Sequence, residues 1–549
     1  MLTEHKLLKV QKFCLAMAIL TLPFDSIPRE YTISLIGGRL SVYLIIFGLL
    51  SCIFEYFKFK FDFLNYKKFI LYIIVFMLWQ SFSLVYGIIN YPFEEFLQSF
   101  DGGKFDVLVD KFPNIDVLID KITLVKIYLF LRLLINLVII PTITYWGFAF
   151  LIYHIYQKEP QNIFYLVRKY VRYLVIICGL YSLLEIAYLK FNSEIAVQIL
   201  KFINPYFYDI AFGHGWWPPL IWKNQLRSLC TEPSFFGIVA AFCIPYLWSY
   251  IYGKTGIKNF LLVCYFTFLI FLTRARTATL LYFGEVFLLY SIVIFDNVKK
   301  MYKSIAIITI SVLLVFSLNV IEYNTIISFF KTSVIFSEQA EVDKSIDLRK
   351  TDIKIYQEEN VVKNNTDNQN KTENTKEYLK NNVFSILDKN ARSNEARFIN
   401  LSVNLRVAAD NPIFGVGNGL KNAYIAEALT EDDLKNAEVA NWHTTTYEVG
   451  PFKSEFPVVN NFANVLVNNG IIGLILWLLP IGYIMLLISK NYKILVSEYT
   501  FTFSAISFCG CIAAMFSNAV WPTYYIALGV LLSVIEFLIK SKSEKQEKF

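Results

Sequence analysis

Apolar runs long enough to cross a bilayer recur along almost the whole of this sequence of 549 residues. A helix rises about 1.5 Å per residue, so about 20 apolar residues cross the roughly 30 Å of hydrocarbon. Backbone polar groups in lipid must be satisfied internally, and runs of this length satisfy them as helices rather than as barrel strands. The sequence therefore predicts an all-α, polytopic bundle of transmembrane helices.

The composition excludes a soluble globular protein. Hydrophobic residues make up 56% of the chain and charged residues only 17%, against about 25% charged residues in soluble domains. The first run lacks a small-residue cleavage site and leads into a second run, so we expect a helix there rather than a signal peptide. We expect about twelve spans in all. They lie near 8–24, 33–54, 68–90, 123–157, 170–191, 233–252, 258–273, 277–296, 302–321, 460–489, 499–517 and 521–540.

Basic residues in the short connections predict the orientation, because cytoplasmic loops carry an excess of Lys and Arg. The basic clusters alternate along the chain so that all of them fall on one side of the membrane. They lie at Lys6 to Lys12, Lys58 to Lys68, Arg168 to Arg172, Lys254 to Lys258, Lys299 to Lys303, Lys490 to Lys493 and in the tail after Lys540. We therefore expect both termini in the cytoplasm. These loops explain the net charge of +7, which calls for no nucleic-acid partner.

A long polar stretch, residues 322–459, interrupts the apolar runs and faces outward under this topology. We expect three regions: spans one to nine in 1–321, a large extracytoplasmic loop in 322–459, and the last spans with a cytoplasmic tail in 460–549. Residues from about 337 to 393 are rich in Lys, Asn, Glu, Asp and Thr and have few core-forming residues. We expect this part of the loop to be a mobile insert.

An amphipathic helix is expected near the end of the long loop. Its apolar stripe, at helical spacing, consists of Phe398, Leu401, Leu405 and Ala408. The pattern ends at Asn411 and Pro412. At about 100° per residue, Arg397 lies beside the stripe and Arg406 points the opposite way. Arg397 is therefore the stronger functional candidate, and the alternative is a solvated arginine on a surface helix.

After Pro412 come Gly415, Gly417 and Gly419, a spacing that permits positive φ and close backbone approach. No strand precedes these glycines, so a nucleotide-binding loop is not predicted.

Charged residues inside spans form a second informative set, because they are costly in lipid and usually face a cavity or a partner. Those in the outward half of a span, or at its rim, are Arg39, Arg132, Glu185, Glu232, Arg274, Arg276 and Glu285. An outward-opening polar cavity would explain this one-sided placement; the alternative is that they pair with one another or snorkel. An arginine fork binds phosphate bidentately and keeps its charge in a low dielectric, which suits a lipid-linked phosphate or diphosphate.

Trp216, Trp217 and Trp222 lie in a Trp/Pro-rich segment just before Arg227. They could stack on sugar faces, or they could form an interfacial aromatic belt. The eight cysteines show neither a disulfide framework nor the spacing of a metal site.

Several segments together resemble the O-antigen polymerase and O-antigen ligase family of bacterial envelope glycosyltransferases. Residues 227–234 (RSLCTEPS) resemble the family's Arg-to-Glu-Pro entry into a mid-chain span, and 273–278 (TRARTA) resemble its Ser-Arg turn between two spans. Residues 397–401 (RFINL) fit its RxxxL pattern, followed by 412–417 (PIFGVG). Residues 460–473 (NNFANVLVNNGIIG) resemble its re-entry into the membrane. The resemblance runs from about Arg227 to Trp477, and the first half of the chain matches in topology alone.

One departure from the family concerns a histidine. Family members often carry His-Asn where this chain has Val459 and Asn460. The long loop's only histidine is His443. It either supplies the missing imidazole from sixteen positions upstream or is an ordinary loop residue. The departure weakens the ligase interpretation in particular, because a loop histidine is held to activate the acceptor there.

The resemblance implies inverting, metal-independent glycosyl transfer, with no cofactor, between substrates delivered on a polyprenyl diphosphate lipid at the outer face of the bacterial cytoplasmic membrane. Guanidinium groups should then bind the leaving diphosphate. We assign this role to Arg132, Arg274, Arg276 and Arg397, with Arg227 in reserve. His443 or Glu232 would accept the proton of the attacking hydroxyl. Besides the glycan lipid and the membrane, a chain-length regulator and a flippase are candidate partners.

We favour a polymerase of lipid-linked repeat units over a ligase, because the His-Asn motif is missing. From another class, a lipid-linked oligosaccharide flippase would also have about twelve spans, but it would show repeat symmetry and short loops. A membrane subunit without activity of its own is a third alternative.

Overall fold

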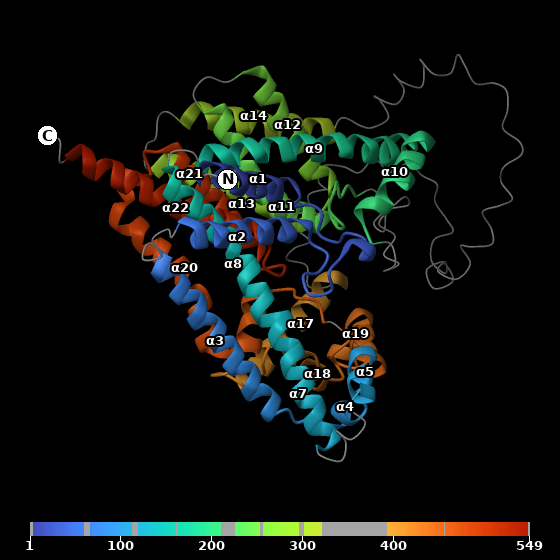
Figure 1. Ribbon diagram of the computed structural model, residues 1–549. Helices are drawn as coiled ribbons and strands as arrows, with labels where there is room; N and C mark the ends of the chain where they lie inside the picture. Colours follow the sequence, from blue (N-terminus) through green and yellow to red (C-terminus); the bar gives the residue numbers. More distant parts are fainter. Residues whose placement is uncertain are drawn as a thin grey trace, which may run out of the picture.

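The computed structural model describes residues 4–59, 66–111, 119–160, 163–209, 225–252, 256–295, 301–320, 392–454 and 456–546 (Figure 1). Within these ranges the regular secondary structure is helical and contains no strand. The expected all-α class is therefore confirmed. Of the insert expected near 337–393, only Arg392 and Ser393 are among the described residues, at the start of a helix. Trp216, Trp217 and Trp222 lie outside the described residues.

Most of the apolar helices share one hydrophobic core and form what we call the main bundle. They are α1 (Glu4–Leu20), α2 (Leu40–Phe59), α8 (Ile140–Lys158), α9 (Ile163–Phe191), α11 (Pro233–Trp248), α12 (Ile257–Leu272), α13 (Arg276–Phe295), α14 (Tyr302–Val320), α21 (Tyr499–Ala514) and α22 (Pro522–Gln546). Two further apolar helices, α3 (Lys67–Ile89) and α20 (Asn461–Leu495), pack on each other and run obliquely away from the bundle (Figure 1). Short 3-10 turns are η1 (Arg29–Tyr31), η6 (Ser249–Ile251) and η9 (Asp433–Lys435).

Every predicted span coincides with a helix. Eight of the described helical segments are long and apolar enough to cross a membrane, and 257–272, 302–314 and 499–514 are shorter apolar helices. The remaining predicted span coincides with α1, which carries charged residues in its first half. The protein is thus an integral membrane protein built as a helix bundle, and the number of spans stays a prediction.

The over-long run near 123–157 forms a single helix of 38 residues, Lys121–Lys158. It consists of α7 (Lys121–Leu133), a π-helical segment η3 (Leu134–Ile139) and α8. At about 1.5 Å per residue it is about 57 Å long, nearly twice the hydrocarbon thickness. One span needs only about half of this length, and the remainder, α7, projects beyond the main bundle (Figure 1).

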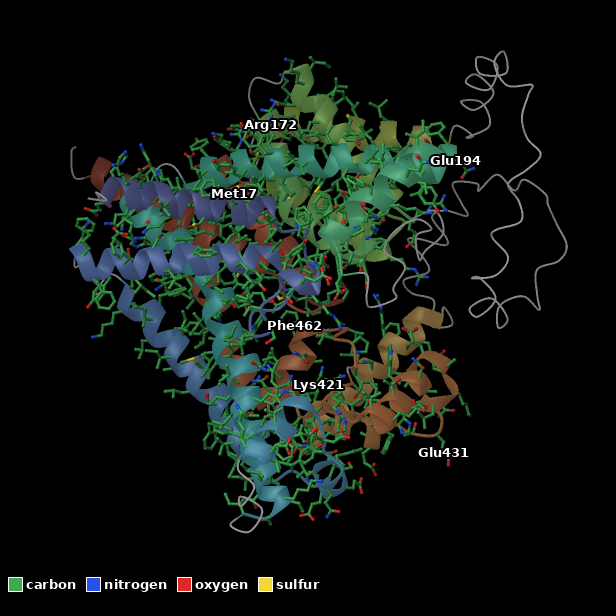
Figure 2. All side chains as sticks on the ribbon, turned by 45° about the vertical axis from the view of Figure 1, so that its right-hand side comes forward. Met17, Arg172, Glu194, Lys421, Glu431 and Phe462 are labelled. Atoms are coloured by element: carbon green, nitrogen blue, oxygen red, sulfur yellow. The ribbon has the colours of Figure 1, made fainter. Side chains whose placement is uncertain are left out.

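The projecting end of this helix belongs to a second body, which we call the outer domain (Figures 1 and 2). Its helices are α4 (Glu94–Gln98), α5 (Gly103–Lys111), α7, α17 (Arg392–Asp410), α18 (Lys421–Glu427) and α19 (Ala437–Val449). Two segments that are far apart in the sequence, 91–111 and 392–454, therefore fold together. Lys453 Nζ lies 2.9 Å from Asp101 Oδ1, and the rings of Tyr91 and Phe452 are 5.7 Å apart.

The amphipathic helix expected after Arg397 is present as α17, and of its apolar stripe the protein buries Ala408 but not Phe398 or Leu405. Phe398 and Leu405 are exposed, and the buried side chains are Ala396, Asn400, Val403, Asn404, Val407 and Ala408. Val403 and Val407 pack in the core of the outer domain. Asn400 and Asn404 are buried on the same face because hydrogen bonds satisfy their amide groups. Arg406, expected to point away from the apolar stripe, is held by the outer domain: its Nη2 donates to Ala428 O at 2.9 Å and to Asp433 Oδ2 at 2.6 Å.

Candidate functional site

A polar pocket lies where α17 and α18 meet the start of α20. It is a shallow recess, with no enclosed space large enough for a water molecule. Its lining consists of Asn400, Leu401, Asn404, Lys421, Pro457, Val458, Val459, Asn460, Ala463 and Asn464. Figure 2 shows Lys421 on the outer-domain side of this junction and Phe462 on the side of the bundle.

The polar side chains of this pocket hold one another in place. Lys421 Nζ donates to Asn464 Oδ1 at 2.7 Å, and Asn404 Nδ2 donates to Asn400 Oδ1 at 2.7 Å. Asn400 Nδ2 in turn donates to the carbonyl of Pro457 at 3.3 Å. A pocket lined by one cation and several amides offers donors to hydroxyl or phosphate oxygens.

The glycine-rich segment after Pro412 positions this pocket by filling a break in α20. Gly470 has φ 66° and interrupts that helix. The carbonyls just before the break accept hydrogen bonds from the segment instead: Val416 N donates to Val467 O at 2.8 Å and Gly417 N to Asn468 O at 2.9 Å. The glycines are thus explained by backbone packing, which is consistent with the expectation of positive φ at Gly415, Gly417 and Gly419.

Helix α3 closes the same junction from the other side. Trp79 Nε1 donates to Asn469 O at 2.9 Å, and Ser83 Oγ lies 2.7 Å from Asn468 O. A Cβ at Gly87 would lie 2.0 Å from Val416 O, so α3 approaches the segment too closely for any side chain there. Asn468, Asn469 and Gly470 at the break are therefore buried by α3 and the glycine-rich segment.

Arg397 is not part of the pocket lining. It is exposed, and it precedes Leu401 by one helical turn. At about 100° per residue its direction falls between those of Asn400 and Leu401, which both line the pocket. The Arg397 side chain therefore leaves α17 on the same side as these two residues, and its functional role stays a prediction.

A second group of polar residues, Glu232, Arg274 and Arg276, lies at one end of the main bundle, and we call it the bundle-end group. Glu232 occupies the N-cap position of α11, Arg276 begins α13, and Arg274 lies in the turn between α12 and α13 with φ 49°. A Cβ at Gly237 would lie 2.7 Å from Ala278 Cβ, so α11 and α13 touch just inside these ends. The structure therefore brings Glu232, Arg274 and Arg276 to the same end of the bundle. All three make further contacts with the protein.

Asp25 supports this group and was not selected from the sequence. Its Oδ2 accepts the hydroxyl of Thr231 at 2.6 Å, and its Oδ1 accepts the Thr231 N–H at 3.2 Å. Burial raises the pKa of Asp25 to about 6, although the Thr231 bonds and the charge of Arg39 lower it. Asp25 thereby fixes the residue next to Glu232.

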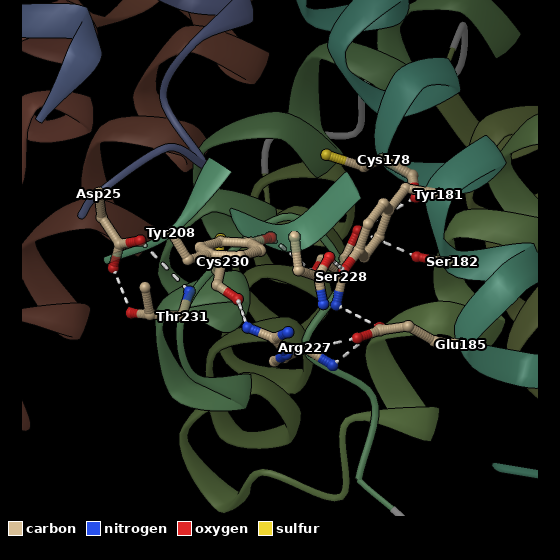
Figure 3. Close-up of polar contacts among 11 residues, drawn as sticks. Asp25, Cys178, Tyr181, Ser182, Glu185, Tyr208, Arg227, Ser228, Cys230 and Thr231 are labelled. Atoms are coloured by element: carbon tan, nitrogen blue, oxygen red, sulfur yellow. Dashed lines mark hydrogen bonds and ion pairs between the residues drawn. The ribbon is translucent and has the colours of Figure 1, made fainter. Parts of the chain in front are cut away.

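Arg227 lies in the segment that leads to Glu232 and is buried in an ion pair (Figure 3). Its Nε lies 3.5 Å from Glu185 Oε1, with side-chain exposures of 3% and 1%. The Arg227 guanidinium also lies over the ring of Tyr208 at 4.7 Å. Glu185 Oε2 accepts the N–H of Ser228 at 2.7 Å. The pair therefore shapes the backbone of the 227–232 segment.

The pocket and the bundle-end group are linked through Trp521. Asn461 N donates to Met515 O at 2.8 Å, which ties the start of α20 to the connection between α21 and α22. Trp521 ends that connection, and its ring lies 5.0 Å from that of Phe235 in the first turn of α11. Arg39 lies over Trp521 at 4.6 Å and donates to the hydroxyl of Tyr145 at 2.7 Å.

The other candidates lie apart from the pocket lining. His443 on α19 packs against the Tyr447 ring at 4.8 Å, and Tyr447 donates to Glu427 Oε2 at 3.2 Å. Arg132 is half-buried in the last turn of α7, next to the π-helical segment η3. Neither His443 nor Arg132 lines the pocket.

Some of the residues that sequence reasoning missed leave a detectable signal. Asn400 and Asn404, and Asn460, Asn464 and Asn468, recur every four residues and thus share one face of their helices. Lys421 and Asp25 carry no such signal, because their positions depend on contacts between distant segments.

Residues 260–478 match the model of the O-antigen ligase family. This match confirms the resemblance drawn from the motifs around Arg274, Arg397 and Gly470, while the segment 227–234 lies outside it. The match indicates activity of the O-antigen ligase or polymerase type, and it implies a lipid-linked glycan substrate in a membrane. No curated protein matches the chain.

Proposed function

We propose that the protein polymerises polyprenyl diphosphate-linked oligosaccharide repeat units at the outer face of the cytoplasmic membrane. The observation that carries this proposal is the polar recess between α17 and α20, which lies in the family-matched residues, with Arg397 one helical turn before its lining residue Leu401. The bundle-end group supplies a second set of guanidinium and carboxyl groups, connected to the pocket through Trp521.

The reaction joins two such substrates in one displacement. A hydroxyl oxygen of the acceptor sugar attacks the anomeric carbon of the donor, and the bond from that carbon to the diphosphate oxygen breaks with its electron pair. Arg276, Arg274 and Arg397 would bind the departing diphosphate, with Arg132 as a further candidate. Glu232 is our choice to accept the hydroxyl proton, and Asp25 and Arg227 act as positioning residues that hold its segment.

A ligase is the second candidate. It would use the same leaving group and a loop histidine to activate the acceptor. Val459 lines the pocket at the position where the resembled family often has histidine, and His443 packs against Tyr447 instead. These two placements favour the polymerase. A flippase or an inactive membrane subunit is disfavoured by the family match to an enzyme family.

The proposal includes an inverting mechanism without metal or cofactor, an outward-facing outer domain, cytoplasmic termini, and the three regions 1–321, 322–459 and 460–549. It also includes functional contacts with a chain-length regulator and a flippase. The alternation of Lys and Arg supports the orientation.

Deletion of the gene followed by glycan electrophoresis tests the proposal. Loss of a polymerase leaves a single repeat unit on the final acceptor. Loss of a ligase accumulates long lipid-linked polymer, and loss of a flippase leaves no surface glycan. Complementation with the wild-type chain must restore the ladder. Long lipid-linked polymer in the deletion strain would replace our proposal with the ligase.

A further inference from the structure

Helix α10 (Glu194–Phe207) leaves the end of α9 through a sharp turn. Asn192 adopts φ 50° after the last turn of α9, and the Ser193 side chain then caps α10 by accepting the N–H of Ala196 at 3.3 Å. Figure 1 shows α10 running across the end of α9 instead of continuing it. Because α9 is long and apolar enough to span the membrane, α10 begins where that span ends.

Three faces of α10 have different surroundings. The face packed on the protein is buried and contains Ala196, Leu200 and Asn204. The hydrated face is exposed and contains Glu194, Gln198 and Lys201. The third face is exposed and apolar, and it contains Ile195, Ile199, Phe202 and Tyr206.

The third face is a narrow stripe. At about 100° per residue its four side chains fall within about 60° of arc. Ile195 is 72% exposed and Phe202 70% exposed, which is unfavourable in water for side chains of this size. A helix with one protein face, one polar face and one apolar stripe has the pattern of a helix lying in a membrane interface.

The stripe continues a surface that the membrane already covers. Leu180, Leu183 and Phe191 of α9 are all more than half exposed, as expected of side chains that face lipid on a spanning helix. Phe191 is the last residue of α9, so the exposed apolar surface runs on to α10 with only the Asn192 turn and the capping residue Ser193 between them.

We propose that α10 lies in the lipid headgroup boundary at that end of α9, with Ile195, Ile199, Phe202 and Tyr206 inserted among the acyl chains. This contact fixes the depth of the ion pair between Arg227 and Glu185 in the membrane, because the residues directly after α10 contact Arg227. Tyr208 lies against the Arg227 guanidinium at 4.7 Å, and Asp209 Oδ2 accepts from Arg29 Nε at 2.8 Å. The inference does not depend on the proposed glycosyl transfer.

Site-directed spin labelling of the full chain in lipid nanodiscs tests it. Cysteines are placed singly at Ile199, Phe202 and Tyr206 on the stripe, and at Glu194, Gln198 and Lys201 on the hydrated face as matched controls. Cys264 and Cys509, the two native cysteines that are not fully buried, are first replaced by serine, and the parent without added cysteine gives the labelling background.

Power saturation with oxygen and with a water-soluble nickel chelate gives the result. We expect the ratio of oxygen to nickel accessibility to be higher at all three stripe positions than at all three controls. Higher nickel accessibility on the stripe would place it in water and overturn the proposal. Low accessibility to both reagents would also overturn it, because the stripe would then be covered by protein, such as a second copy of the chain.

Discussion

A Cβ at Gly470 would lie 2.0 Å from the carbonyl oxygen of Ile413. Gly470 interrupts α20 with φ 66° and ψ −173°, and Ile413 belongs to the segment that fills the break. Ile471 N donates to Pro412 O at 2.8 Å just beside this contact, so the two backbones are fixed against each other. The outer domain is therefore joined to the membrane helices through backbone atoms, with no room for adjustment by side-chain rotation.

We expect Gly470→Ala to prevent stable folding. This backbone conformation is essentially confined to glycine and costs on the order of 1–3 kcal/mol for a residue with a Cβ, and the overlap with Ile413 adds to it because a backbone carbonyl cannot move aside. The measurement is the yield of monodisperse protein in detergent and its Tm. Gly482→Ala is the matched control, because it lies in the same helix and its Cβ would meet nothing within 4 Å. Equal Tm values for the two variants would contradict the role of this contact.

The helical class and the places of the spans could be predicted from the sequence, because each span depends on its own run of apolar residues. The face of α17 could not be predicted in the same way. Phe398 and Leu405 are more apolar than Asn400 and Asn404, yet the asparagines are buried because the Pro457 carbonyl lies within reach. Local periodicity carries no information about a partner that comes from a distant segment.

The candidate site likewise contains residues that could be predicted from local sequence and residues that could not. Arg397 and the glycines after Pro412 could be selected because helical angle and backbone freedom are local properties. The pairing of Glu185 with Arg227, and of Asp25 with Thr231, depends on how α9, α11 and the first connection pack. These pairs require the folded chain to be known.

The orientation makes a separate prediction. The alternating Lys and Arg clusters predict that the outer domain is outside and that both termini are in the cytoplasm. A periplasm-dependent reporter fused after Asn365 should be active, and a cytoplasm-dependent reporter at the same position should be silent. Fusions after Lys540 should behave in the opposite way. A cytoplasmic reporter that is active after Asn365 would reverse the topology and with it the side on which the pocket opens.

Asp25 makes stability depend on pH in a defined direction. Its pKa is raised to about 6 in the folded protein, against about 3.9 for an unfolded Asp. The folded state therefore binds the proton more tightly, and its stabilising effect is lost as the pH rises from about 4 through about 6. Asp25→Asn resembles the protonated side chain and should remove this loss.

The measurement is the Tm of the wild type and of Asp25→Asn across that range of pH. We expect the Tm of Asp25→Asn to rise relative to that of the wild type as the pH rises from about 4 to about 7, because the two proteins share all other titrating groups. Asp101→Asn is the control, since Asp101 is exposed and Lys453 lowers its pKa, so it is already ionised in both states above about pH 4 and its effect on Tm should stay nearly constant across this range. A constant difference between wild type and Asp25→Asn would show that Asp25 does not titrate in this range.

Arg397 should be required for turnover even when its charge is kept. We expect Arg397→Lys to lower the rate of polymer formation on the order of a hundredfold, because a point charge cannot reproduce the two parallel hydrogen bonds of a guanidinium to a diphosphate. Arg406→Lys is the matched control on the same helix. Arg406 binds Ala428 and Asp433 within the outer domain, and its half-exposed ion pair contributes less than about 1 kcal/mol. The rate is measured on purified lipid-linked repeat units at equal amounts of folded enzyme. A full rate for Arg397→Lys, or an equal loss in both variants, would remove Arg397 from the site and leave diphosphate binding to Arg274 and Arg276.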